Sequence, residues 1–187
     1  MSFKVEFKNY LDDLHKSLCE VSDWMYENPE LGFQEFKTSK HLVDYIQKNS
    51  KSVNYPSHGL ETAFDVTFGE DGPLVVICVE YDALPEIGHA CGHNIIATAS
   101  IGAGLGLKDI ASKLGIRVKL LGTPAEEGGG GKIILINEGA FEDASCSMMI
   151  HPGYEDVVNP TFTTIQQYTI EYFGKDAHAA GAPDQGI

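Results

Sequence analysis

The chain has 187 residues, of which 43% are hydrophobic and 21% charged, and a formal net charge of −14. These proportions are those of an ordinary soluble globular chain of about one domain. The acidic balance makes nucleic acid and anionic membranes poor partners, and no stretch approaches the ~20 apolar residues that span a bilayer. Residues 1–4 lead into an amphipathic pattern and not an apolar signal core, so we expect a cytoplasmic location.

Two amphipathic helices are predicted first. Apolar residues recur at helical spacing from Phe7 to Trp24, and Asn28-Pro29 ends that pattern. A second helix, over about 33–48, is expected to bury Phe36, Val43 and Ile46. Next, 63–68 suggests an outer strand of the sheet that follows.

Three apolar runs then predict strands at 74–79, 116–121 and 146–150. The segments between them, 93–114 and 132–137, are predicted helices that end before Gly115 and Gly139. Strand and helix in alternation are typical of a parallel sheet with right-handed crossovers. Cys78 and Cys146 are expected to be free thiols in buried strands.

The character of the chain changes after residue 151. Apolar and polar residues alternate over 163–173, which predicts a half-exposed strand of a different sheet. The chain stops at Ile187, just after Pro183-Asp184, which has the pattern of a helix start. The sequence is therefore expected to be a fragment or a truncated product.

Polar residues follow each of the three predicted buried strands. They are Cys91-Gly92-His93, Glu126-Glu127 and His151-Pro152. Strand ends on one side of an open α/β sheet converge on a crevice where ligands bind. Thiolate, imidazole and carboxylate there predict a transition-metal site, and the spare carboxylate predicts a hydrolase. The alternative is that they are ordinary loop residues at strand ends.

Four segments carry a family resemblance: Glu80–Pro85, Gly88–Asn94, Gly122–Glu127 and Gly174–His178. Together they resemble the aminoacylase/carboxypeptidase family of metal-dependent amidohydrolases. The branch most similar holds the Xaa-Arg (β-alanyl-lysine-type) dipeptidases and the aminobenzoyl-glutamate and indole-acetyl-amino-acid hydrolases. The resemblance covers nearly the whole chain, with the motifs in the family's order.

The resemblance implies a phosphorylase/hydrolase-like three-layer α/β fold, with helices on both faces of the sheet. Residues 1–157 would form the N-terminal segment of the catalytic domain, so the fold is present in part. Residues 158–187 would begin an α+β lid and dimerisation domain, through which the complete protein forms a homodimer. The family's last metal ligand, a histidine farther downstream, is not in this sequence.

The resemblance also implies site roles. The implied ligands of a divalent metal are Cys91, His93, Glu127 and His151. Zn²⁺ is favoured by sulfur, imidazole and carboxylate together, with Mn²⁺ or Co²⁺ as alternatives. The wider family has a further histidine ligand two residues before the position of Asp82, and this chain has Glu80 there. Cys91 is expected to replace that histidine.

Three further residues receive catalytic roles from the resemblance. Glu126 corresponds to the general base, and Asp82 to the acid that orients a metal ligand. His178 corresponds to the lid histidine that reaches the partner subunit's site and polarises the scissile carbonyl. The implied activity is hydrolysis of an amide bond in dipeptides or N-acyl amino acids.

Two other functions remain open. Cys91 could be a nucleophile activated by His93 or His89, although that chemistry has no use for the glutamate pair or His151. Alternatively, the chain is a truncated, catalytically inactive product that binds metal weakly or pairs with a full-length subunit.

Overall fold

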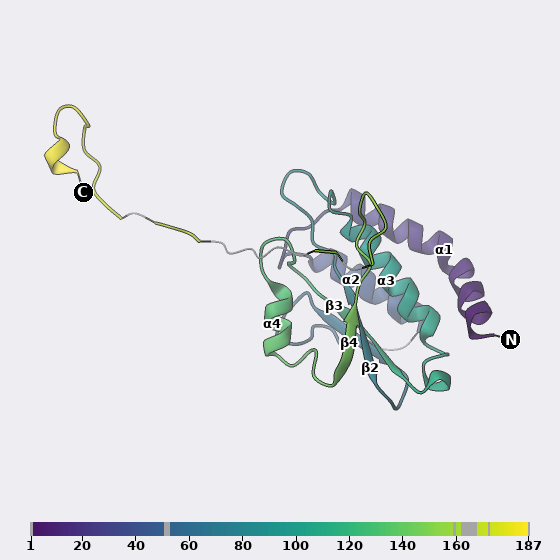
Figure 1. Ribbon diagram of the computed structural model, residues 1–187. Coiled ribbons are helices and arrows are strands. Elements are labelled where there is room, and N and C mark those ends of the chain that lie inside the picture. Colours follow the sequence, from purple (N-terminus) through teal and green to yellow (C-terminus); the bar gives the residue numbers. More distant parts are fainter. Residues whose placement is uncertain (1, 51–52, 159, 162–167, 172, 187) are drawn as a thin grey trace. The chain divides into compact units, whose positions relative to one another are not determined.

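The computed structural model describes residues 2–50, 53–158, 160–161, 168–171 and 173–186. The chain divides into two compact units, Met1–Gly153 and Tyr154–Ile187. The first unit holds every described strand and α-helix (Figure 1). No helix in the described ranges is both long and apolar enough to cross a membrane.

Two helices begin the first unit: α1 (Phe3–Glu27) and α2 (Phe36–Asn49). α1 ends as predicted, because the Asn28 side chain donates a hydrogen bond to the Trp24 carbonyl at 2.8 Å just before Pro29. α2 begins three residues later than predicted, since Phe33 has a φ of 62° that a helix does not accommodate. Phe36 is 48% exposed, so the prediction that it is buried was wrong.

The sheet has four strands in the order β1-β3-β2-β4. They are β1 (Phe64–Phe68), β2 (Leu74–Val79), β3 (Arg117–Gly122) and β4 (Ala144–Met148). β2 is parallel to both β3 and β4, and β1 is antiparallel to β3 at the other edge. The predicted parallel sheet with one outer strand is confirmed.

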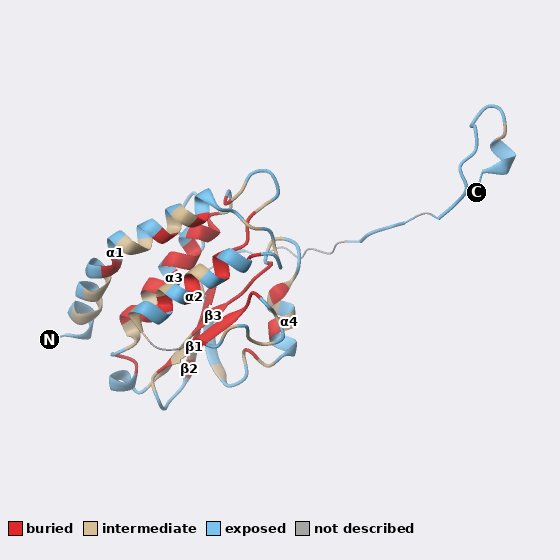
Figure 2. Ribbon diagram, turned by 180° about the vertical axis from the view of Figure 1, so that it is seen from behind, coloured by how far each residue is buried: buried red, intermediate tan, exposed pale blue. Residues whose placement is uncertain are grey.

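Helices cover the two faces of this sheet unequally. α3 (His93–Leu107), α1 and α2 pack on the face to which Val79 and Leu120 point. α4 (Gly131–Asn137) packs its Leu135 on the opposite face, against Cys78 and Leu121. Successive residues of a strand point to opposite faces, so one strand feeds both cores. Figure 2 shows the central strands and α3 buried between layers whose outer surfaces are exposed.

α3 is buried on most of its surface because it lies between the sheet and α1. A Cβ at Gly104 would come within 2.5 Å of the Leu120 side chain of β3, so only glycine permits this approach. The predicted helix over 93–114 is divided in two. α3 ends at Leu107, and a separate 3₁₀ turn, Ser112–Leu114, ends at Gly115 with its left-handed φ of 65°.

β4 begins two residues earlier than predicted and lies at the sheet edge. Four of its five residues are exposed, including Cys146. The prediction that Cys146 is buried was therefore wrong. An apolar run indicates a strand but does not say whether that strand is central.

The second unit contains one short element among its described residues, a 3₁₀ turn at Pro183–Gln185. Of the strand predicted at 163–173, residues 168–171 and 173 are described and are not in a strand, and the rest lie outside the described residues. A catalytic segment at 1–157 and a lid at 158–187 stay predictions.

Candidate metal centre

The carboxyl ends of β2 and β3 carry the site's acids. Glu80 and Asp82 follow β2, which ends at Val79, and Glu126 and Glu127 lie in the loop after β3. Because β2 and β3 are parallel, these loops meet at the same end of the sheet, beyond the carboxyl ends of the two strands. The first residue of α3, His93, lies among them.

His93 is the centre of this cluster and is fully buried. Its Nδ1 lies 2.8 Å from the Asp82 carbonyl oxygen and 3.1 Å from Asp82 Oδ1. Those contacts hold the ring so that Nε2 faces three other carboxylates. Nε2 is 3.4 Å from Glu80 Oε2, 3.6 Å from Glu127 Oε1 and 3.8 Å from Glu126 Oε2.

The cluster fits a divalent metal. Two sets of three ligand atoms each lie within 4.8 Å of one another: Glu80, His93 and His151, and His93, Glu126 and Glu127. In the described part of the chain, His93 Nε2 and Glu80 Oε2 are buried without a hydrogen-bond partner. Such atoms are costly to bury unless something binds them, and a cation bound between them would remove the cost.

Asp82 links two parts of the site. Besides contacting His93, its Oδ2 accepts a hydrogen bond from the Glu127 backbone N–H at 2.9 Å. Burial favours the protonated acid, but hydrogen bonds from His93 and Glu127 outweigh burial and lower the pKa of Asp82. Burial lowers the pKa of His93, but the hydrogen bond to Asp82 and the nearby acids raise it, and the net effect is a raised pKa. Asp82 is thus a fixed anion that orients His93.

The two neighbouring glutamates differ in their exposure. The Glu126 side chain is 41% exposed and that of Glu127 is 24% exposed. Burial and the negative charge of Glu80 raise the pKa of Glu126. Glu126 is therefore the more accessible to solvent, whereas Glu127 is fixed by its backbone bond to Asp82.

Cys91 lies beside Glu127 and outside both three-residue sets. Its hydrogen bond with Glu127, burial and the surrounding acids raise its pKa to about 11. A catalytic thiolate needs a lowered pKa, so these surroundings oppose the cysteine-nucleophile alternative. A bound metal would reverse this by deprotonating the thiol.

His151 reaches the cluster because its loop packs on the start of α3. The His151 and His93 rings are edge to face, with centroids 6.2 Å apart. Between Cys91 and His93, Gly92 has a φ of 80°, and a Cβ there would lie 2.9 Å from Pro152 Cγ. Glycine is required here both for its φ and for this close packing.

Glu35 is far from the site residues in sequence but forms hydrogen bonds that fix the loop carrying them, and no local sequence pattern predicts this. Its Oε1 accepts a hydrogen bond from the Ala125 N–H at 2.8 Å, and its Oε2 accepts one from the Thr62 hydroxyl at 3.1 Å. Ala125 precedes the glutamate pair and has a φ of 55°, a strained value for alanine. Glu35 is fully buried, which raises its pKa. It stabilises the strained turn that carries Glu126 and Glu127.

Glu80 and Lys132 are the other residues that the sequence did not predict for the site. Glu80 is two residues before Asp82, directly after β2, and residues two apart in extended chain point to the same side, which is a signal that could have identified it. Tyr81 between them points away and donates to the Thr62 carbonyl at 2.7 Å. Lys132 of α4 forms an ion pair with Glu80 Oε1.

Two further histidines have different settings. His89 is buried, and neither ring nitrogen has a hydrogen-bond partner among the residues the structure describes. Burial and the charge of His93 lower its pKa. His178 belongs to the second unit, where its Nδ1 accepts hydrogen bonds from the backbone N–H groups of Ala180 and Gly181. Its predicted role stays a prediction.

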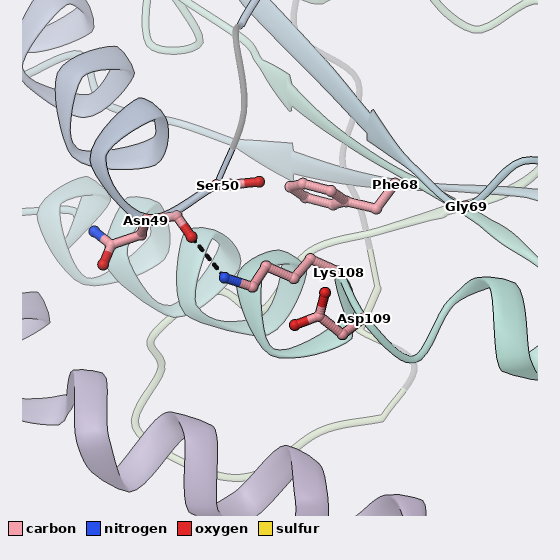
Figure 3. Close-up of a pocket in the computed structure, with 6 residues that line it drawn as sticks. All are labelled: Asn49, Ser50, Phe68, Gly69, Lys108 and Asp109. Atoms are coloured by element: carbon pink, nitrogen blue, oxygen red, sulfur yellow. Dashed lines mark hydrogen bonds between the residues drawn. The ribbon is translucent and has the colours of Figure 1, made fainter.

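A surface pocket of about 320 Å³ lies at the other end of the sheet (Figure 3). It is lined by Asn49, Ser50, Phe68, Gly69, Lys108 and Asp109. Phe68 pairs with Val118 at the start of β3, whereas the acid cluster follows the end of that strand. Figure 3 shows the Lys108 ammonium hydrogen-bonded to the Asn49 carbonyl. Among the described residues that line this pocket, Asp109 has the one carboxylate, so they do not resemble a metal site.

No family model matches the sequence. The mouse Xaa-Arg dipeptidase is 37% identical over 95% of this chain and 44% of its own length. A component of the Escherichia coli p-aminobenzoyl-glutamate hydrolase is 28% identical over 97% of this chain and 43% of its own length. A solved Bacillus subtilis structure, described as a dinuclear metal-binding peptidase of the M20 family, is 25% identical with a TM-score of 0.65. The matched region covers 73% of this chain and 42% of the Bacillus subtilis chain.

The fold is similar to that of a solved α/β metallopeptidase, and the cluster after β2 and β3 offers possible metal ligands. Within that class, the chain is similar in sequence to a dipeptidase and an amidohydrolase, and similar in fold to a peptidase described as a member of the M20 family. The predicted resemblance is confirmed. The chain spans less than half the length of these relatives.

Proposed function

We propose that this chain is part of a metal-dependent amidohydrolase that cleaves dipeptides or N-acyl amino acids. The observation that carries the proposal is His93, whose buried Nε2 is oriented by Asp82 and faces three carboxylates within 3.8 Å. Amide hydrolysis is supported by relatives named as a dipeptidase and an aminobenzoyl-glutamate hydrolase.

The proposed ligands are Cys91, His93, Glu127 and His151, with Zn²⁺ favoured over Mn²⁺ or Co²⁺. When bound, such an ion supplies a Lewis acid that polarises the amide carbonyl and makes water more acidic. Asp82 keeps the proton of His93 on Nδ1, which leaves Nε2 free to bind the cation.

Glu126 is the proposed general base. Its partly exposed carboxylate lies next to His93 and takes a proton from the water that attacks the amide carbon. The same carboxyl group then gives that proton to the amine nitrogen that leaves. Glu127 cannot exchange roles with it easily, because its backbone is bonded to Asp82.

His178 is proposed to hydrogen-bond the scissile carbonyl oxygen in the site of the partner subunit, from a lid that begins at residue 158. This role rests on the Gly174–His178 motif. The homodimer and the cytoplasmic location also remain expectations drawn from the sequence.

A second candidate function is metal binding without turnover, alone or paired with a full-length subunit. It is favoured by the possible ligand sets among the described residues, which could bind a cation whether or not substrate is turned over. On this candidate, the 187-residue chain alone would bind metal but hydrolyse little substrate.

Metal titration and an activity panel test both candidates. The purified chain, and any longer in-frame product of the same gene, would be titrated with Zn²⁺, Mn²⁺ and Co²⁺. Each would then be assayed on α-dipeptides, β-alanyl dipeptides and N-acyl amino acids. Metal-dependent turnover in either supports the hydrolase, and binding without turnover in both supports the second candidate. Failure of every preparation to bind a divalent ion would contradict both.

A further inference from the structure

Glu80 is a deeply buried acid of the cluster, and one of its two carboxylate oxygens has no hydrogen-bond partner among the described residues. Its side chain is 2% exposed, compared with 41% for Glu126. Oε1 pairs with the Lys132 ammonium. Oε2 lies 3.4 Å from His93 Nε2, and the described residues provide no hydrogen-bond partner for either of these two atoms. Half of this carboxylate is therefore aimed at the same point as the unused nitrogen of His93.

The charge around that point is unbalanced. Four carboxylates surround His93: Glu80, Asp82, Glu126 and Glu127. Lys132 forms an ion pair with Glu80. A buried carboxylate is stable only when paired and hydrogen-bonded. Lys132 satisfies one oxygen of Glu80 and leaves the other directed into the site.

The donor set at this point has a recognisable composition. Ligand atoms of Glu80, His93 and His151 lie within 4.8 Å of one another. Two imidazoles and one carboxylate, with a further position open to water or substrate, form a common ligand set of catalytic zinc.

We propose that Glu80 is a metal ligand of this chain, binding the same divalent ion as His93 and His151 through Oε2. Lys132 holds the other carboxylate oxygen, so that it positions Glu80 and balances part of its charge. This inference rests on the proposed function, because it requires a cation at His93. The competing explanation is that Glu80 is only the structural partner of Lys132.

Metal affinity separates the two explanations. Glu80→Gln keeps the size and polarity of the side chain but removes its charge. We expect it to weaken Zn²⁺ binding, measured by competition with a chromophoric chelator, by at least the ~10-fold that follows the loss of a group that only orients a ligand. The absorption spectrum of the Co²⁺ form should change as well, since a ligand is altered. Glu30→Gln is the matched control, because that half-buried carboxylate bonds to Thr38 and should leave both readouts unchanged.

Lys132→Met supplies a second test, which can be used even if Glu80→Gln fails to fold. Without metal, the variant should melt at a lower temperature than the wild type, because Glu80 loses its cation. Saturating Zn²⁺ should restore most of that difference, since the ion compensates the same carboxylate. Lys119→Met is the control: its ammonium bonds the Ala140 carbonyl, so any loss should be equal with and without Zn²⁺.

The outcomes are distinct. Unchanged Zn²⁺ affinity and an unchanged Co²⁺ spectrum in Glu80→Gln would overturn the inference and leave the proposed function intact. An equal loss of stability in Lys132→Met with and without Zn²⁺ would also overturn it. A wild-type chain that binds none of the three ions would instead refute the proposed metal site, and this inference with it.

Discussion

The two ends of the sheet differ in how their buried and half-buried polar groups are bonded. At the end that Figure 3 shows, Lys108 donates to the Asn49 carbonyl at 2.6 Å and to the Tyr10 hydroxyl at 2.8 Å. At the opposite end, His93 and Glu80 direct a nitrogen and an oxygen at each other without a hydrogen bond. The first end is hollow and its lysine is bonded; the second holds buried atoms that need a ligand. For the candidate metal centre, unmet bonding is therefore a more informative signal than a hollow in the surface.

The largest expected effect belongs to Glu126. In a preparation with amidase activity, Glu126→Gln should lower the rate of hydrolysis by ~10²–10⁴-fold, the usual consequence of losing a general base. Metal content, measured by elemental analysis, should not change. Full activity in the variant would assign the base to another residue.

Loss of Asp82 should weaken metal binding without removing a ligand. Asp82→Ala frees the His93 ring and the Glu127 backbone, and we expect Zn²⁺ affinity to fall ~10–100-fold. Asp65→Ala is the matched control, because Asp65 lies 3.2 Å from His58 in a similar acid–histidine pair outside the metal-ligand sets. If both variants lose affinity equally, the effect is on folding and not on the site.

Loss of the Glu35 side chain should mainly lower the stability of the fold. Glu35→Ala leaves the buried Ala125 N–H without its acceptor, which should lower the free energy of unfolding by ~1–3 kcal/mol. Glu35→Gln keeps an acceptor oxygen and should lose much less. Denaturant unfolding of the two variants measures the difference, and equal losses would show that the charge matters and the hydrogen bond does not.

The pH dependence of stability tests the charge of Glu35 separately. Burial raises its pKa above the usual 4.5, so the folded chain keeps a proton that the unfolded chain has lost. The stability that this group contributes is full below pH 4.5 and falls as the pH rises through the raised pKa. Glu35→Gln should therefore gain melting temperature relative to wild type as the pH rises to 7. Glu61→Gln, an exposed control, should not.

The smallest effect is expected at the hollow end of the sheet. Lys108→Met removes two hydrogen bonds and should cost ~1–2 kcal/mol of unfolding free energy, about the net worth of two such bonds. Zn²⁺ affinity should equal that of the wild type. A fall in affinity would show that the two ends are coupled, and would contradict the contrast between them.

The elements of the fold were predictable where apolar residues repeat regularly. Both central strands and α1 were located from their patterns, because burial selects the side chains there. Edges were not predictable in the same way. The apolar run around Cys146 predicted a strand, but its place at the sheet edge depends on strand order, which no local window contains.

The site was predictable in the residues that follow strand ends. Parallel strands bring His93 close to Glu126 and Glu127 in one possible ligand set and close to His151 in another, as strand order alone would suggest. Glu35 could not be predicted, because its bond to Ala125 joins residues 90 positions apart. Cys91 was expected to take the ligand position where this chain has Glu80, yet the structure puts Glu80 in a compact ligand set and Cys91 beside Glu127.

The edge position of β4 has a consequence for amide hydrogen exchange. β2 is bonded on both sides, to β3 and to β4, so its amide hydrogens should exchange through the rarest opening of the sheet. β4 pairs only with β2 among the described strands, so alternate amides point away from the sheet and are open to water. Its exchange pattern should therefore alternate along 144–148, with every second amide fast. Any strand that pairs with β4, from this chain or another, would slow just those fast amides and reveal where it binds.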